Sequence, residues 1–130
     1  MNYISYFRFL ILAPIAMVFV AVALDFSYAF PESVNGYYGQ LAVDGFSNLY
    51  NAYLLLAVMA FIADLMMLFF ITHSREIWIV LISAFYIVAS LMPELTIMSP
   101  FSIVLVQIAS LMAGLKISLA YLSPAIRDLF

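Results

Sequence analysis

Four long apolar runs, almost free of charge, limit what this chain can fold into. They extend over residues 9–24, over 45–72 with Asp64 as the only charged residue, over 77–93 and over 95–115. Each is near the ~20 residues that an α-helix needs to cross about 30 Å of hydrocarbon. Because a backbone in lipid must satisfy its own hydrogen bonds, we expect helices rather than isolated strands.

The composition requires lipid as the solvent for much of this surface. The chain has 130 residues, of which 68% are hydrophobic and 8% charged, whereas a soluble domain is about half apolar and about a quarter charged. A soluble domain of this length cannot bury so much apolar surface. The sequence therefore predicts an all-α integral membrane bundle of four transmembrane helices, forming a single domain over 1–130. The expected spans are about 8–29, 48–72, 76–92 and 100–122, with an outer loop at 30–47.

The positions of the basic residues predict the orientation. With a cytoplasmic N-terminus, Arg8, Arg75 and Arg127 all fall on the inner side, and the loops at 30–47 and 93–99 contain no lysine or arginine. This is the positive-inside pattern. We therefore expect both termini to be cytoplasmic and the chain to reside in the cytoplasmic membrane, with an organelle membrane as the alternative.

The N-terminal segment allows another topology. Arg8, the apolar stretch after it and the small residues of 21–23 or 27–29 also resemble a secretory signal peptide. Cleavage there would leave three spans. We expect the segment to remain as the first of four.

Helix boundaries carry fitting residues. Ser99 followed by Pro100 predicts the start of the fourth span, and Ser74 with Glu76 in the first turn predicts a cap for the third. Candidate caps for the second span are Asp44, Ser47 and Asn48. In the outer loop, residues 40–43 are mildly amphipathic and are expected to lie along the membrane surface.

Asp64 is the most informative residue because a charge within the hydrocarbon costs at least a few kcal/mol and normally has a partner. It precedes the inner end of the second span by about eight residues, hence about 12 Å. Lys116 lies at nearly the same depth in the fourth span, which runs in the same direction. We therefore predict an Asp64–Lys116 ion pair between these helices.

Three interpretations of this pair remain open. A structural clamp is the first choice. In the second, Asp64 is a proton or cation relay with Lys116 as its switch. In the third the residues do not meet: Lys116 extends to the inner headgroups, and Asp64 faces a partner chain.

The fourth span also carries a seam of polar or small side chains at helical spacing, and the third span has a polar face that includes Tyr86. Interhelical hydrogen bonds of such side chains orient helices more than they stabilise them. The seam consists of Gln107, Ser110, Gly114 and Ser118.

The sequence lacks the residues that several kinds of binding and catalysis require. The chain has no cysteine and a single histidine, His73, so we expect no metal site, no cofactor and a solvated turn at His73. The net charge of −3 does not suit a nucleic-acid binder, which needs a basic patch. Asp25 is expected to be solvated. No catalytic motif such as a P-loop is present.

These observations favour a non-catalytic subunit, scaffold or assembly component of a membrane complex. The expected partners are the lipid bilayer and other membrane-protein chains or further copies of this one. The alternative is a small homo-oligomeric proton- or ion-coupled transporter or channel that uses Asp64 and Lys116.

Overall fold

The computed structural model describes residues 2–130, and the part it describes contains helices and no strands. The helices are α1 (Tyr3–Ser27), α2 (Glu32–Asp44), α3 (Asn48–Leu68), α4 (Ser74–Leu91), α5 (Pro100–Leu122) and α6 (Pro124–Arg127). Within residues 2–130, four of them, α1, α3, α4 and α5, are long and apolar enough to cross a membrane. The all-α membrane bundle predicted from the sequence is confirmed.

The helix bounds follow the capping residues. α5 covers the expected 100–122, and the Ser99 hydroxyl accepts a hydrogen bond from Ser102 N at its start. Ser47 caps α3 in the same way through Tyr50 N. The prediction that Ser74 caps the third span is wrong, because Ser74 is already helical and His73 before it has a left-handed backbone with φ of 66°.

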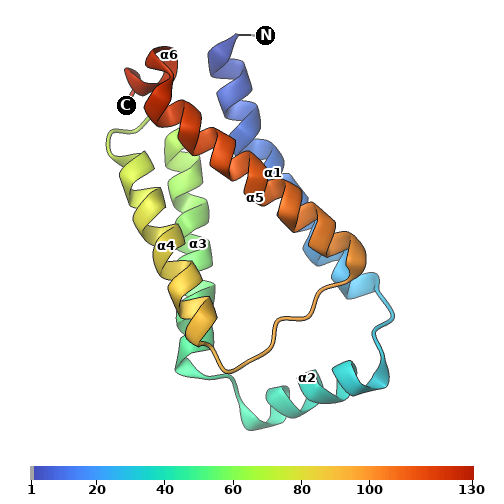
Figure 1. Ribbon diagram of the computed structural model, residues 1–130. Coiled ribbons are helices and arrows are strands. Elements are labelled where there is room, and N and C mark those ends of the chain that lie inside the picture. Colours follow the sequence, from blue (N-terminus) through green and yellow to red (C-terminus); the bar gives the residue numbers. More distant parts are fainter. Residues whose placement is uncertain (1) are drawn as a thin grey trace.

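The region expected as an outer loop, 30–47, contains α2. Pro31 precedes this helix, Glu32 lies in its first turn near the positive end of the helix dipole, and Gly45 ends it with φ of 86°. None of the α2 residues is buried. Figure 1 shows α2 crossing the end of the molecule opposite the chain termini, which we call the α2 end.

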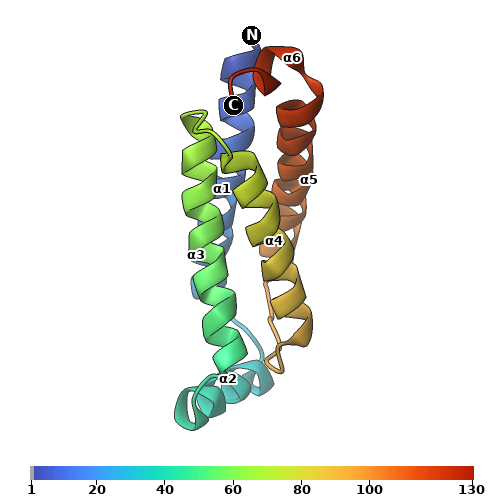
Figure 2. The same cartoon turned by 90° about the vertical axis from the view of Figure 1, so that its left-hand side faces the viewer.

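The spanning helices form a wedge. The most extensive contacts join α1 to α5 and α3 to α4, so the bundle consists of an α1–α5 pair and an α3–α4 pair. The pairs lean together at the end that holds both termini, the terminal end, and diverge toward the α2 end (Figure 1). In Figure 2 the α3–α4 pair lies in front of the α1–α5 pair.

The core of the wedge lies at its terminal end. Phe7 of α1 is 0% exposed, and its ring centroid lies 5.7 Å from that of Phe70 and 5.9 Å from that of Phe130. Phe70 has φ of 55°, a conformation that ordinarily favours glycine. The aromatic contacts of its ring offset that conformational cost. The cluster is completed by Ile11, Ala63, Met67, Trp78, Ala120 and Ile126.

At the α2 end, polar groups hold the termini of the spanning helices. The Ser99 backbone N–H and the Ser102 hydroxyl both donate to Asp25 Oδ1, at 2.9 and 2.6 Å. The Ser47 backbone N–H and hydroxyl donate to Glu94 Oε1 and Oε2, at 2.7 and 2.9 Å. Asp25 therefore joins α1 to α5 rather than standing free in solvent as the sequence suggested, and Glu94 anchors the start of α3.

Two tyrosines of α2 fasten this helix to the segment before α5. The Tyr37 hydroxyl accepts a hydrogen bond from Leu95 N at 2.8 Å, and the Tyr38 hydroxyl accepts one from Ile97 N at 3.1 Å. Together with Glu94, these contacts tie residues 94–97 to both α2 and α3.

Replacing Phe7 with alanine should destabilise the bundle by about 3 kcal/mol, because a fully buried aromatic side chain leaves a cavity. The measurement is the free energy of unfolding in detergent micelles. Phe26→Ala is the matched control, since Phe26 is 88% exposed. Equal losses for the two variants would contradict the placement of the core.

The pH dependence of stability should include a contribution from Glu94. Partial burial raises the pKa of Glu94, but the hydrogen bonds from the Ser47 hydroxyl and backbone N–H together lower it by more, so the pKa lies below its ordinary 4.5. A lowered native pKa stabilises the fold above pH 4.5, and this stabilisation is lost as the pH falls through the native value.

Glu94→Gln should therefore be less stable than the wild type near neutral pH, and the difference should shrink on acidification. The measurement compares thermal unfolding of both proteins over an acid pH series. A difference that stays constant across the series would show that Glu94 is not bound as an ionised carboxylate.

Candidate functional site

The structure brings Asp64 and Lys116 together near the terminal end of the wedge. Asp64 lies about one turn before the end of α3, and Lys116 lies on the face of α5 that is turned toward the bundle. The Lys116 ammonium donates a hydrogen bond to Asp64 Oδ1 and forms an ion pair with it. The two side chains are 2% and 16% exposed. This pair crosses from one helix pair to the other.

The indole of Trp78 on α4 completes the site. Lys116 Nζ lies 3.9 Å from the centroid of its ring, within the distance at which an ammonium is attracted to an aromatic face. Trp78 is 8% exposed, and its Nε1 is buried with no hydrogen-bond partner among the described residues. Side chains from α3 and α4 thus converge on one ammonium group of α5.

A second contact, which the sequence did not reveal, joins α4 to α5 nearer the terminal end. Arg75 Nη1 donates to the Ala120 backbone oxygen at 2.8 Å, and the guanidinium lies 4.6 Å from the Tyr121 ring centroid. Arg75 Nε also pairs with Glu76 at 2.8 Å. The sequence indicates Arg75 only through its charge, because a hydrogen bond to a backbone oxygen leaves no pattern in the sequence.

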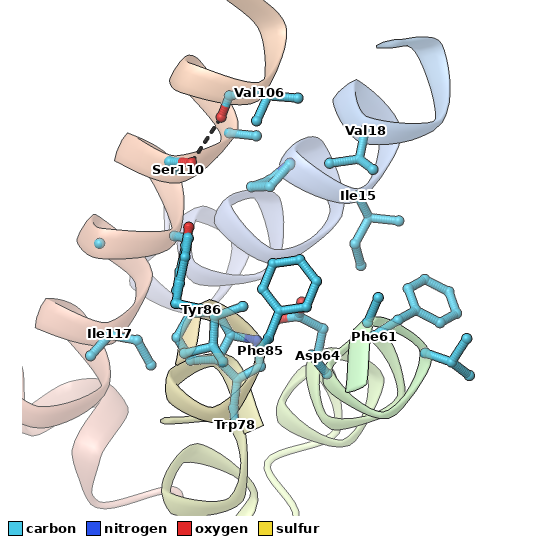
Figure 3. Close-up of a pocket in the computed structure, with 18 of the residues that line it drawn as sticks. Ile15, Val18, Phe61, Asp64, Trp78, Phe85, Tyr86, Val106, Ser110 and Ile117 are labelled. Carbon is cyan, nitrogen blue, oxygen red and sulfur yellow. Dashed lines mark hydrogen bonds between the residues drawn. The ribbon is translucent and has the colours of Figure 1, made fainter. Parts of the chain in front are cut away.

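An apolar cleft of about 830 Å³ separates the helix pairs and ends at Asp64 and Trp78. All the spanning helices contribute to it: Ile15 and Val18 from α1, Phe61 from α3, and Val106 from α5 are among its lining residues. Figure 3 shows these side chains around the space between the helices, with Phe85 and Tyr86 projecting from α4. Asp64 lines the cleft, whereas Lys116 lies behind it.

The predicted polar seam does not join helices within this chain. Gln107, Ser110 and Ser118 are all exposed. The Ser110 and Ser118 hydroxyls donate to backbone oxygens of their own helix, Val106 O and Gly114 O, both at 2.9 Å; the first bond is drawn in Figure 3. A serine whose hydroxyl returns to its own helix has no need of a neighbouring helix.

The seam divides between different surfaces. Ser110 and Gly114 line the cleft, as Tyr86 does from α4, while Gln107 and Ser118 lie outside it. Tyr86 is 59% exposed and makes no hydrogen bond to the seam in the described chain. The Gln107 amide likewise has no hydrogen-bond partner among residues 2–130.

The possible metal-ligating side chains are dispersed over the described residues. Over the described residues no group of three or more histidine, aspartate or glutamate side chains could hold a metal ion. His73 is exposed in the turn between α3 and α4, where the sequence predicted it.

Breaking the ion pair on one side should destabilise the fold strongly. Asp64→Asn leaves the Lys116 ammonium buried without a counter-charge, for which we expect a loss of about 3 kcal/mol. Asp64→Leu with Lys116→Leu removes both charges and should recover most of this stability. The measurement is the free energy of unfolding of the single and double variants in the same micelles.

The exposed pair of Arg127 and Asp128 provides the control. These side chains are 50% and 66% exposed, and such pairs contribute little. Asp128→Asn should leave stability unchanged. A double variant at positions 64 and 116 that is no better than Asp64→Asn would rule out the clamp.

Comparison of the chain with protein-family models, with curated proteins and with solved structures found no match in any of the three. Its function must therefore be argued from the geometry described above.

Proposed function

We propose that this membrane protein is a non-catalytic subunit or assembly component of a membrane complex, joined to its partner through an outer face of α5. The observation that carries the proposal is Gln107, an exposed amide within a spanning helix and without a hydrogen-bond partner in the described chain. It lies seven residues into α5, which is about 10 Å from the α2 end of that helix.

An unsatisfied amide at this depth is costly in lipid. Its transfer from water to an apolar environment without a hydrogen bond costs a few kcal/mol, and the bilayer interior has no water to supply one. A polar side chain or backbone oxygen of a neighbouring helix removes this cost. Membrane helices associate through such groups, which contribute about 0.6 kcal/mol each on average.

The surroundings of Gln107 suit close helix approach. Ser118 follows it at eleven residues, so the two share one side of α5, and both lie outside the cleft. Small and polar residues on one side of a helix are typical of interfaces between membrane helices.

The distribution of mass also favours lateral contacts. The turn between α3 and α4 covers only 69–73, and α6 is a helix of 4 residues. At the terminal end, therefore, little of the described chain extends beyond the spanning helices to hold a soluble partner. With termini in the cytoplasm, as the basic residues predict, the α2 end would face outward.

A second function, proton- or ion-coupled transport, is favoured by a different observation. Asp64 lines the cleft while its partner Lys116 is buried behind it. A cation or proton arriving through the cleft would meet the carboxylate first and compete with Lys116 for it. An intramembrane carboxylate placed in this way is the usual coupling group of such proteins.

The subunit proposal predicts weaker association for Gln107→Leu. Losing one interhelical hydrogen bond of about 0.6 kcal/mol raises the dissociation constant by about threefold, while the fold itself is unaffected. Native mass spectrometry of nanodisc-extracted particles measures the fraction bound to partner chains or to further copies. Ile108→Val is the control, because Ile108 is exposed at the same depth but lies about 100° around α5 from Gln107.

Unchanged association of Gln107→Leu, with the partner retained in full, would contradict the proposed interface. A particle that contains only one copy of this chain would contradict the subunit proposal itself.

The transport candidate makes a separate prediction. Asp64→Asn should abolish proton-driven flux in proteoliposomes because an amide cannot carry the proton. The double leucine variant should be equally inactive although it folds. Wild-type proteoliposomes without cation or proton flux above the protein-free background would dismiss this candidate.

A further inference from the structure

We propose that the cleft binds a membrane lipid, with one hydrocarbon chain between the helix pairs and an amine headgroup in the cavity at the α2 end. This inference does not depend on the proposed subunit function. It concerns the space between the helix pairs rather than the outer face of α5.

The walls of the cleft suit a hydrocarbon chain. Its volume of about 830 Å³ lies within the range of small-molecule sites, about 300–1,000 Å³. Val18, Phe19, Val58, Phe61 and Ile82 are among the apolar side chains that form most of the lining. An empty space of this size would forfeit the contacts of all these side chains.

The length of the cleft matches one leaflet. Along α3 its lining extends from Asp64, at the closed end, to Tyr53, which is about 16 Å along the helix axis. Half of the hydrocarbon core is about 15 Å. A chain that enters from the leaflet at the α2 end therefore ends near the level of Asp64 and Trp78.

A second cavity, of about 240 Å³, continues the cleft toward the membrane surface. Tyr53 and Met98 line both spaces, so these side chains form the boundary between them. The smaller cavity also contains polar groups, among them Asp25, Tyr38 and Glu94. From the cleft to the smaller cavity the walls change from apolar to polar, as a lipid changes from its hydrocarbon chain to its headgroup.

Charge selects the headgroup. Asp25, Glu32, Asp44 and Glu94 lie toward the α2 end, whereas all arginine and lysine residues belong to the N-terminal part of α1, to the start of α4 or to residues 116–127. The negative electrostatic potential at the α2 end favours a lipid headgroup with a positive charge and disfavours an anionic headgroup.

Hydrogen bonding narrows the choice further. Asp25 accepts its hydrogen bonds through Oδ1, and Oδ2 has no such partner in the described chain. A primary ammonium can donate to it, whereas the quaternary ammonium of choline has no N–H to donate. Ethanolamine is therefore the headgroup class that satisfies both charge and hydrogen bonding.

The single tryptophan of the chain makes the proposal measurable. Trp78 lines the closed end of the cleft, and the sequence contains no other tryptophan. Quenching of its fluorescence by lipids brominated near the chain ends reports a chain inside the cleft. The probes are brominated phosphatidylethanolamine, phosphatidylcholine and phosphatidylglycerol, each mixed with unbrominated carrier lipid in proteoliposomes of the intact protein.

We expect phosphatidylethanolamine to quench Trp78 at lower mole fraction than phosphatidylcholine, and phosphatidylglycerol to be weakest. Gly114→Leu fills the cleft from a position where an added Cβ meets nothing within 4 Å, and should remove most of the quenching. Ala23→Leu, at an exposed position of α1, should leave the quenching unchanged. Circular dichroism establishes that both variants remain folded.

The contrary results are equally specific. Quenching that Gly114→Leu does not reduce would place the bromines on the outer surface of the bundle and overturn the site. Absence of quenching by every lipid would show that the cleft excludes chains and would also overturn it. Equal potency of all three lipids would overturn the assignment of the headgroup.

Discussion

The bundle depends on one buried ammonium group. Lys116 enters the space between the helix pairs from α5 and meets a carboxylate of α3 and an indole of α4. Few other contacts connect α5 to the α3–α4 pair, apart from the Arg75 bond to Ala120. In lipid, where apolar side chains gain little by leaving the solvent, a charge pair of this kind fixes how the helix pairs approach each other. A buried charge that loses its partner destabilises the fold strongly, so Lys116 and Asp64 must stay within reach of each other.

The wedge follows from this arrangement. Contacts are tight at the terminal end, where Phe7, Phe70 and Phe130 pack beside the ion pair. At the α2 end, Asp25 joins α1 to α5 within one pair, and Glu94 connects the segment before α5 to the start of α3. The helices therefore diverge between these points, and the cleft is the space that results. Asp64 therefore belongs both to the ion pair that joins the helix pairs and to the lining of the cleft.

Much of the fold could be predicted from the sequence because lipid imposes strict rules on a chain. Charge-free runs of spanning length have few alternatives to helices, and the cap at Ser99 placed the start of α5 at the correct residue. The pairing of Asp64 with Lys116 followed from equal depth on helices that run in the same direction. Whether this pair acts as a clamp or as a relay stays a prediction.

Other features had no signal in the sequence. α2 occupies a stretch that reads as a polar loop, because the tyrosine hydroxyls that fasten it bond to backbone groups more than fifty residues away. For the seam on α5, helical spacing identifies a shared face but does not indicate what that face meets. The cleft depends on the angle between helix pairs, which no local pattern encodes.

The most direct test of the central claim is the distance between the helix pairs, measured by double electron–electron resonance in lipid. Because the chain has no cysteine, spin labels can be placed at Phe69 and Leu122, which are 71% and 79% exposed, near the terminal end of each pair. The account predicts a narrow distance distribution in the otherwise unaltered protein and a broad, longer one when Asp64→Leu is added. An unchanged distribution in that variant would show that the ion pair does not hold the helix pairs together.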